Sequence, residues 1–149
     1  MDPRDIHLVQ HTWQKVVPIA KTAADLFYDR LFELDPAAAE LFATTDMAEQ
    51  KVKLLQTLAT VISSLHAPTP MLQDILDLGQ RHAGYGVTAD HYDLVGSALL
   101  WTLEQALGEA WTEETYHAWS QAYQLIAEQM LKGAAEGAIS AVGSTQRTA

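Results

Sequence analysis

The 149-residue chain contains no cysteine. This absence excludes disulfides, thiolate zinc sites, iron–sulfur clusters and cysteine nucleophiles together. A neutral imidazole is therefore the best ligand that the chain offers to a transition metal. Basic residues are also scarce, with 9 Lys and Arg against 19 Asp and Glu and a formal net charge of −10. Because phosphates would be repelled and no basic cluster offsets this locally, we expect no nucleic-acid partner.

Long apolar runs are missing as well. No segment approaches the about 20 apolar residues of a membrane span, and the charged residues 1–5 lack the apolar core of a signal peptide. We therefore expect no membrane span and a cytoplasmic location. Hydrophobic residues at 48% and charged residues at 19% are typical of a globular domain, and the length fits a single one.

Helical periodicity dominates the chain, and no segment shows sustained strand alternation. Asp2 and Pro3 begin the first helix, which stops near Pro18. The pattern predicts an all-α fold of seven or eight unequal helices, with the domain over 1–132 and a flexible, Gly- and Ala-rich tail over 133–149. The further helices are expected at about 20–34, 36–42, 46–65, a short segment before residue 84, 89–107 and 112–131.

The histidines are the candidate metal ligands. His82 ends a short apolar helix, and Gly84 and Gly86 follow at once, so the backbone can turn sharply beside it. Taken alone, such a histidine is more often a packed side chain than a ligand. His7 and His11 lie one helical turn apart and could chelate a metal, but their position beside the buried stripe of the first helix favours plain exposure. Three others fall near expected helix ends or surfaces: His66, His91 and His117.

Four separate blocks of this sequence resemble globins, in particular the single-domain haemoglobins of bacteria and the vertebrate neuroglobins. The most specific block is 78–87, which continues through 91–96, and the others are 26–32 and 118–123. The match runs from about residue 5 to 130. The resemblance implies the globin fold, a three-over-three helical sandwich around a haem pocket, with haem b (iron protoporphyrin IX) as cofactor.

The resemblance assigns a role to each matching position. It implies that His82 is the proximal iron ligand and that Phe42 wedges against the porphyrin. On the distal side it places Tyr28, Gln50 and Leu54, a set similar to that of bacterial haemoglobins and flavohaemoglobins. Tyr28 and Gln50 would donate hydrogen bonds to a bound gas, and they are the residues expected to carry any catalysis.

The rim of the implied pocket is assigned more loosely. Arg81 and Lys53 are candidates for the haem propionates, which need cationic partners, although ordinary solvated side chains fit these positions nearly as well. Tyr85 and Val87 are also expected to contact the cofactor. Lys51 and Lys53 are the alternatives to Gln50 as the residue that faces the pocket mouth.

One position departs from the bacterial pattern. In some bacterial haemoglobins a tyrosine and a glutamate hydrogen-bond the proximal histidine and make it more anionic. This chain has Tyr92 at the first position, but Ala134 at the second, with Glu136 on a different helical face. A peroxidase-like push is therefore not expected.

The resemblance leaves several functions open. The first is a haem protein, a monomer or weak dimer, that reversibly binds O2, NO and CO. The second is a nitric oxide dioxygenase; because no flavin or nicotinamide domain follows the globin-like residues, its turnover is expected to need a separate reductase. A gas or redox sensor is the third. A relative that has lost its cofactor is disfavoured, since both His82 and Phe42 are present.

Overall fold

The computed structural model describes the backbone of residues 1–148 and the side chains of residues 1–137. Over residues 1–148 it contains six α-helices and no strand, which confirms the all-α prediction. The α-helices are α1 (Pro3–Val16), α2 (Ala20–Leu34), α3 (Met47–Ser63), α4 (Thr69–Gly84), α5 (Ala89–Leu107) and α6 (Glu113–Thr148). Three short 3-10 helices join them: η1 (Val17–Ile19), η2 (Pro36–Phe42) and η3 (Gly108–Ala110).

Aspartates begin three of these elements by capping their first backbone N–H groups. The Asp2 carboxylate accepts a hydrogen bond from the N–H of Asp5 at 2.9 Å, as the sequence predicts for the start of α1. Asp35 caps η2 and Asp46 caps α3 in the same way. An aspartate at this position offsets the unpaired N–H groups and the positive end of the helix dipole.

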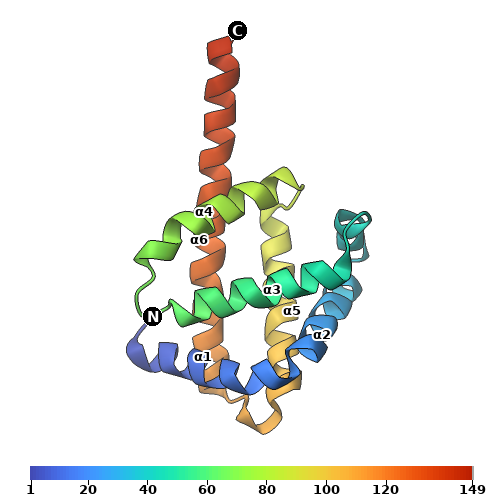
Figure 1. Cartoon of the computed structure of the whole chain (residues 1–149), viewed down its shortest axis with the longest axis vertical. Helices are drawn as coiled ribbons and strands as arrows, with labels where there is room; N and C mark the ends of the chain where they lie inside the picture. Colours follow the sequence, from blue (N-terminus) through green and yellow to red (C-terminus); the bar gives the residue numbers. More distant parts are fainter. Residues whose placement is uncertain (149) are drawn as a thin grey trace.

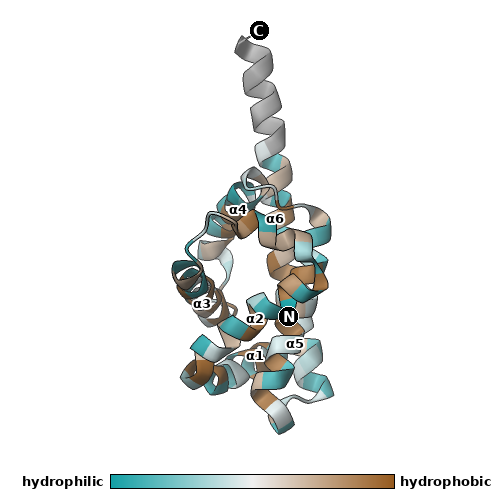
Figure 2. Cartoon of the chain, turned by 90° about the vertical axis from the view of Figure 1, so that its right-hand side faces the viewer, coloured by the Kyte–Doolittle hydropathy of each residue, from teal (hydrophilic) through white to brown (hydrophobic). Residues whose placement is uncertain are grey.

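The helices form two layers around a shared core. α3 and α4 cross in front of α5 and α6 in Figure 1, and in the view turned by 90° in Figure 2 α3 lies opposite α5 while α4 packs against α6. The principal packed pairs are α4 with α6, α2 with α5 and α1 with α6. No helix in the part of the chain that the structure describes is long and apolar enough to cross a membrane.

Glycines bring α4 and α6 into backbone contact. A Cβ placed on Gly79 would lie 1.9 Å from the carbonyl oxygen of Met130, and one on Gly133 would lie 2.1 Å from that of Leu76. No side chain fits at either position, so the two helices cross at the closest approach that a backbone allows. This crossing fixes the height and tilt of α4, which carries His82.

The contact between α4 and α6 also explains why the predicted end of the last helix is wrong. Its end was expected near Leu131 because glycines follow, but α6 continues to Thr148. Gly133 and Gly137 are helical here because each faces α4, at Leu76 and at Gln80. Tertiary packing thus outweighs the poor helix propensity of glycine. Flexibility of residues 133–149 stays a prediction, and Ala149 lies outside the described residues.

Candidate functional site

Tyr28 and Gln50 form the first half of the site. Tyr28, on α2, is 4% exposed, and its hydroxyl oxygen accepts a hydrogen bond from Nε2 of Gln50 on α3 at 3.2 Å. Burial raises the pKa of the Tyr28 phenol, and the bond from Gln50 lowers it by less, so the group stays protonated at neutral pH. Because its oxygen accepts from Gln50, the hydroxyl hydrogen remains available to a further acceptor.

Three phenylalanine rings hold Tyr28 in place. Phe27 and Phe42 both meet its ring edge to face, with centroids 5.0 and 5.6 Å away. Phe32 lies 6.1 Å from Tyr28 and 5.7 Å from Phe42. Such geometries are favourable for aromatic pairs. The structure therefore brings Phe42, from η2, together with Tyr28 and Gln50, as the resemblance implies.

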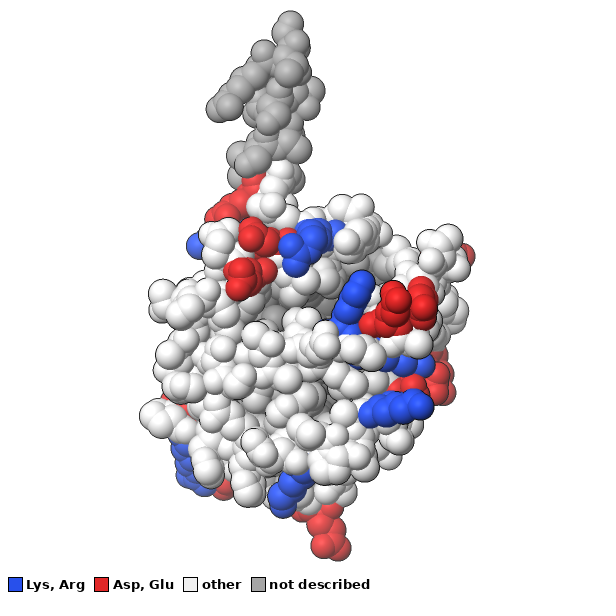
Figure 3. All heavy atoms as spheres, viewed as in Figure 1, with Lys and Arg blue, Asp and Glu red and all other residues white. Residues whose placement is uncertain are grey.

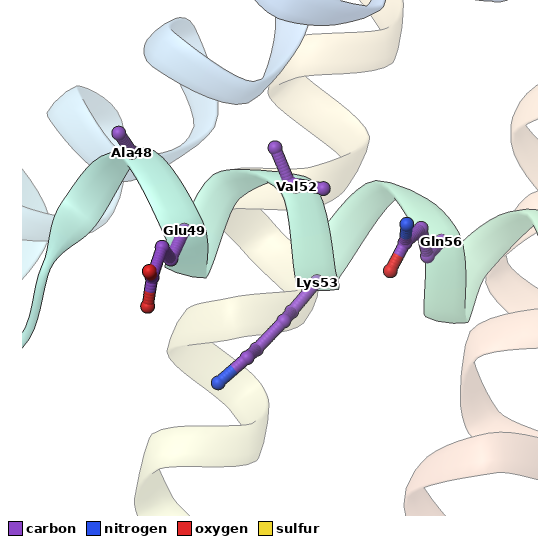
Figure 4. Close-up of a pocket in the computed structure, with 5 residues that line it drawn as sticks. All are labelled: Ala48, Glu49, Val52, Lys53 and Gln56. Carbon is purple, nitrogen blue, oxygen red and sulfur yellow. The ribbon is translucent and has the colours of Figure 1, made fainter.

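Lys51 and Lys53 point to different surroundings. The Nζ of Lys51 lies 2.9 Å from Oδ1 of Asp25, an ion pair that ties α3 to α2. Lys53 is exposed and lines a shallow recess on α3 with Ala48, Glu49, Val52 and Gln56. Figure 4 shows its side chain extended away from the helix. Of these three residues, Gln50 is the one that hydrogen-bonds to Tyr28.

His82 forms the second half of the site. Its side chain on α4 is half-buried, and its Nδ1 lies 2.8 Å from the carbonyl oxygen of Leu78. Because a carbonyl only accepts, Nδ1 carries the hydrogen and Nε2 keeps its lone pair. Burial lowers the pKa of His82; the hydrogen bond to the Leu78 carbonyl opposes this by less, and the neighbouring Arg81 guanidinium adds a still smaller lowering. The imidazole is thus held neutral in one orientation, with Nε2 as the nitrogen that could bind a metal.

The corner after His82 is tightly turned. Gly86 has a φ of +93°, which favours glycine, and the N–H of Val87 donates to the carbonyl of His82 at 3.0 Å. Val87 is half-buried against the core, whereas Tyr85 is 69% exposed with its ring 6.3 Å from that of His82. Arg81 is exposed and forms no ion pair within residues 1–137.

The hydrogen bond that orients His82 comes from its own helix. Ala134 lines a recess between α4 and α6 together with Gln80 and Gly84, and Glu136 is exposed. The Tyr92 side chain is buried, and its hydroxyl has no hydrogen-bond partner in the part of the chain that the structure describes. Among the described residues, therefore, no carboxylate hydrogen-bonds to His82, and the partner of its Nδ1 is the Leu78 carbonyl.

The elements that carry the two halves, and their neighbours, also bear apolar side chains that are only partly buried. They belong to α3, α4, α5, η2 and the corner after α4, and each packs against the core: Phe42, Leu54, Leu58, Leu78, Val87 and Leu94. Figure 3 shows this face hollowed between α4 and α3 and largely free of charge there, with charged side chains around the recess. The arrangement suits a large apolar ligand with polar edges.

Two contributors were missed from the sequence. Phe32 lies one turn beyond Tyr28 on α2, so the helical period could have placed both rings on one face. The Asp25–Lys51 pair joins residues on different helices and has no local signal.

Comparisons with known proteins place the chain in a family. The globin family model matches residues 25–130. Neuroglobin of Danio rerio is 26% identical over 146 residues, covering 89% of this chain and 92% of its own. Flavohemoproteins of Bacillus subtilis and Xylella fastidiosa are 29% and 32% identical over 136 and 127 residues, covering 88% and 84% of this chain. The chain spans 33% and 32% of the length of these two flavohemoproteins.

Among solved structures, a hexacoordinated heme protein from an anhydrobiotic tardigrade superposes with a TM-score of 0.82. The match covers 90% of this chain and 95% of that one at 15% sequence identity, so it supports the fold alone. The helical order, the paired layers and a family match over residues 25–130 agree with one another and confirm the resemblance seen in the sequence. This chain belongs to the globin family.

Proposed function

We propose that this globin holds a haem between His82 and the Tyr28–Gln50 pair and reversibly binds dioxygen and other small gases, NO and CO among them. The observation that carries the proposal is the hydrogen bond from Gln50 to Tyr28, because it leaves a buried, protonated phenol with a hydrogen to donate, packed among aromatic rings. Membership of the globin family supports haem as the cofactor.

The donor set fits a haem. His82 offers a neutral imidazole with a free Nε2, which is the axial ligand that haem iron takes from globins. Phe42, Leu54 and Val87 offer apolar surface to a porphyrin. Haem b is the form proposed, because the sequence has no cysteine for thioether attachment. When bound, the haem supplies an iron atom with one coordination position open to a gas.

The protein's own part is to hold that gas and to exclude water. Tyr28 donates its hydroxyl hydrogen to the partly negative end of the ligand, and Gln50 orients Tyr28 while keeping a second amide hydrogen of its own. A neutral hydrogen bond contributes about 1 kcal/mol, and one to a charged acceptor about 1.5–3 kcal/mol. The pair therefore slows release of the gas.

Charged side chains at the rim complete the proposal. Lys53 and Arg81 are both exposed and lie on α3 and α4, the two helices that border the recess of Figure 3. We assign them to the two propionates of the haem, to which each would donate charge-assisted hydrogen bonds. Tyr85, beside His82, covers an edge of the cofactor.

The test is the dioxygen dissociation rate of the Tyr28→Phe variant. Loss of one donated bond of about 1 kcal/mol is expected to raise that rate about fivefold or more. Tyr116→Phe, at an exposed tyrosine on α6, is the matched control and should leave it unchanged. An unchanged rate in Tyr28→Phe would refute the proposed donor, and purified protein without a Soret band would refute the haem.

A nitric oxide dioxygenase is the second candidate. Identities of 29–32% to flavohemoproteins over most of this chain favour it, as does a distal side with two donors. The chain aligns with only about a third of those proteins, and turnover would require a reductase to supply the electrons. Nitric oxide consumption should rise on adding a reductase and NADH, and should fall in Tyr28→Phe. A rate no higher than that of myoglobin would count against this activity.

A further inference from the structure

His7 and His11 form a pair of imidazoles on the outer face of α1. Their rings are stacked, with centroids 5.7 Å apart and an angle of 15° between the ring planes. Both side chains are exposed. Residues one turn apart on a helix project side by side, so the two rings are neighbours because of the backbone and not by chance rotamers.

The helix beneath the pair is firmly held. Val9, Trp13 and Val16 are buried on the opposite side of α1, and Asp2 caps its start. The backbone spacing between His7 and His11 is therefore fixed before any ligand arrives. Such preorganisation removes much of the ordering cost of binding.

The charges around the pair permit a cation. Arg4, one turn before His7, is turned toward α6, where its guanidinium pairs with Glu114 at 2.8 Å. Lys15 lies one turn beyond His11 and is exposed, so its flexible side chain can stay in solvent. The net charge of the chain is −10, which raises the local concentration of cations.

We propose that His7 and His11 bind one divalent late transition-metal ion, with Cu2+ preferred, at a site separate from the haem pocket. Imidazole nitrogens suit Cu2+, Ni2+ and Zn2+, and Cu2+ stands highest in the affinity order. Two histidines spaced four residues apart on a helix can share one ion. Because both side chains are exposed, they are free to rotate and present one nitrogen each to the ion, and water completes its coordination.

The experiment is calorimetric titration of CuCl2 into the intact purified protein in a weakly coordinating buffer, for the parent chain and for His7→Gln and His11→Gln. His117→Gln is the matched control, since His117 is an exposed histidine on α6 whose Nε2 pairs with the Gln121 side chain instead of a second imidazole. The parent and the control should bind one ion per chain with saturation. Each of the other two variants should lose that saturable phase.

A second measurement identifies the ligands. Electron paramagnetic resonance of Cu2+ bound to the oxidised protein, read as the difference between samples with and without the ion, should show two nitrogen ligands in the parent. Unchanged binding in both His7→Gln and His11→Gln would overturn the proposal, and so would loss of binding in His117→Gln alone. Both sites of substitution are exposed, so the variants should fold as the parent does.

Discussion

Gly79→Ala tests whether the α4–α6 crossing is as close as the structure shows. The added methyl carbon would lie 1.9 Å from the carbonyl oxygen of Met130 and 2.6 Å from its carbonyl carbon. Real Cβ atoms essentially never come closer than 3.0 Å to another heavy atom, so the helices must separate by roughly 1 Å at this point. The neighbour is backbone within a helix, and it cannot rotate away.

Two opposing effects set the size of the change. Alanine favours a helix over glycine by about 1 kcal/mol, whereas overpacking of a core costs about 1–3 kcal/mol and occasionally more. Because the overlap is with backbone on the most extensively packed helix pair, the steric cost should win. With the steric cost at the upper end of its range, about 3 kcal/mol, we expect the free energy of unfolding to fall by about 2 kcal/mol.

The assay is urea denaturation followed by far-ultraviolet circular dichroism. Gly84→Ala is the matched control: it changes the same residue type on the same helix, but nothing lies within 4 Å of the new methyl group. This variant should be as stable as the parent or gain up to about 1 kcal/mol. Equal midpoints for the parent and Gly79→Ala would show that the predicted backbone contact is not present.

Gly79→Ala should also change the geometry of the candidate site. His82 lies three residues beyond Gly79, so a displaced α4 moves the imidazole away from the position where it would hold the iron. Transfer of haem to excess apomyoglobin should therefore be faster from Gly79→Ala than from Gly84→Ala. Equal rates would mean that the crossing does not position His82.

Two further predictions concern buried tyrosines. Tyr92→Phe removes a buried hydroxyl that has no hydrogen-bond partner among the described residues. In urea denaturation the free energy of unfolding should therefore stay unchanged or rise by about 1 kcal/mol, and a clear fall in it would contradict the prediction. Burial raises the pKa of Tyr28, Tyr92 and Tyr123 above the ordinary value of about 10, so the folded chain keeps these protons after the unfolded chain has released them. The stability that these three protonated tyrosines contribute is complete below a pH of about 10 and falls as the pH rises above that value. Denaturant titrations at increasing pH would detect the fall. A constant free energy of unfolding above pH of about 10 would contradict the burial.

Much of the fold could be predicted because its signals are local. A helix cap joins residues two or three positions apart, so Asp2 and Asp46 could be recognised without knowing any tertiary contact. Helical period likewise places Val9, Trp13 and Val16 on one buried face of α1. The glycine corner after His82 is local in the same sense, and the Gly86 φ of +93° bears it out.

The candidate site was predicted from resemblance more than from physical pattern. Nothing local in the sequence pairs Tyr28 with Gln50, 22 residues away. Their hydrogen bond depends on how α2 and α3 cross. The partner of His82 is different: the Leu78 carbonyl lies one turn back on the same helix, a contact that the spacing alone allows.

The sequence by itself determined most of the helices, their caps and the absence of thiol chemistry, because each depends on residue type or on neighbours within a turn. The tertiary structure alone decided how far α6 continues, which side chain reaches Tyr28 and where Lys51 turns. The physical reason is that all three of these features depend on distances between helices. Glycines at the α4–α6 crossing set one such distance, and in the sequence they predict only the end of a helix.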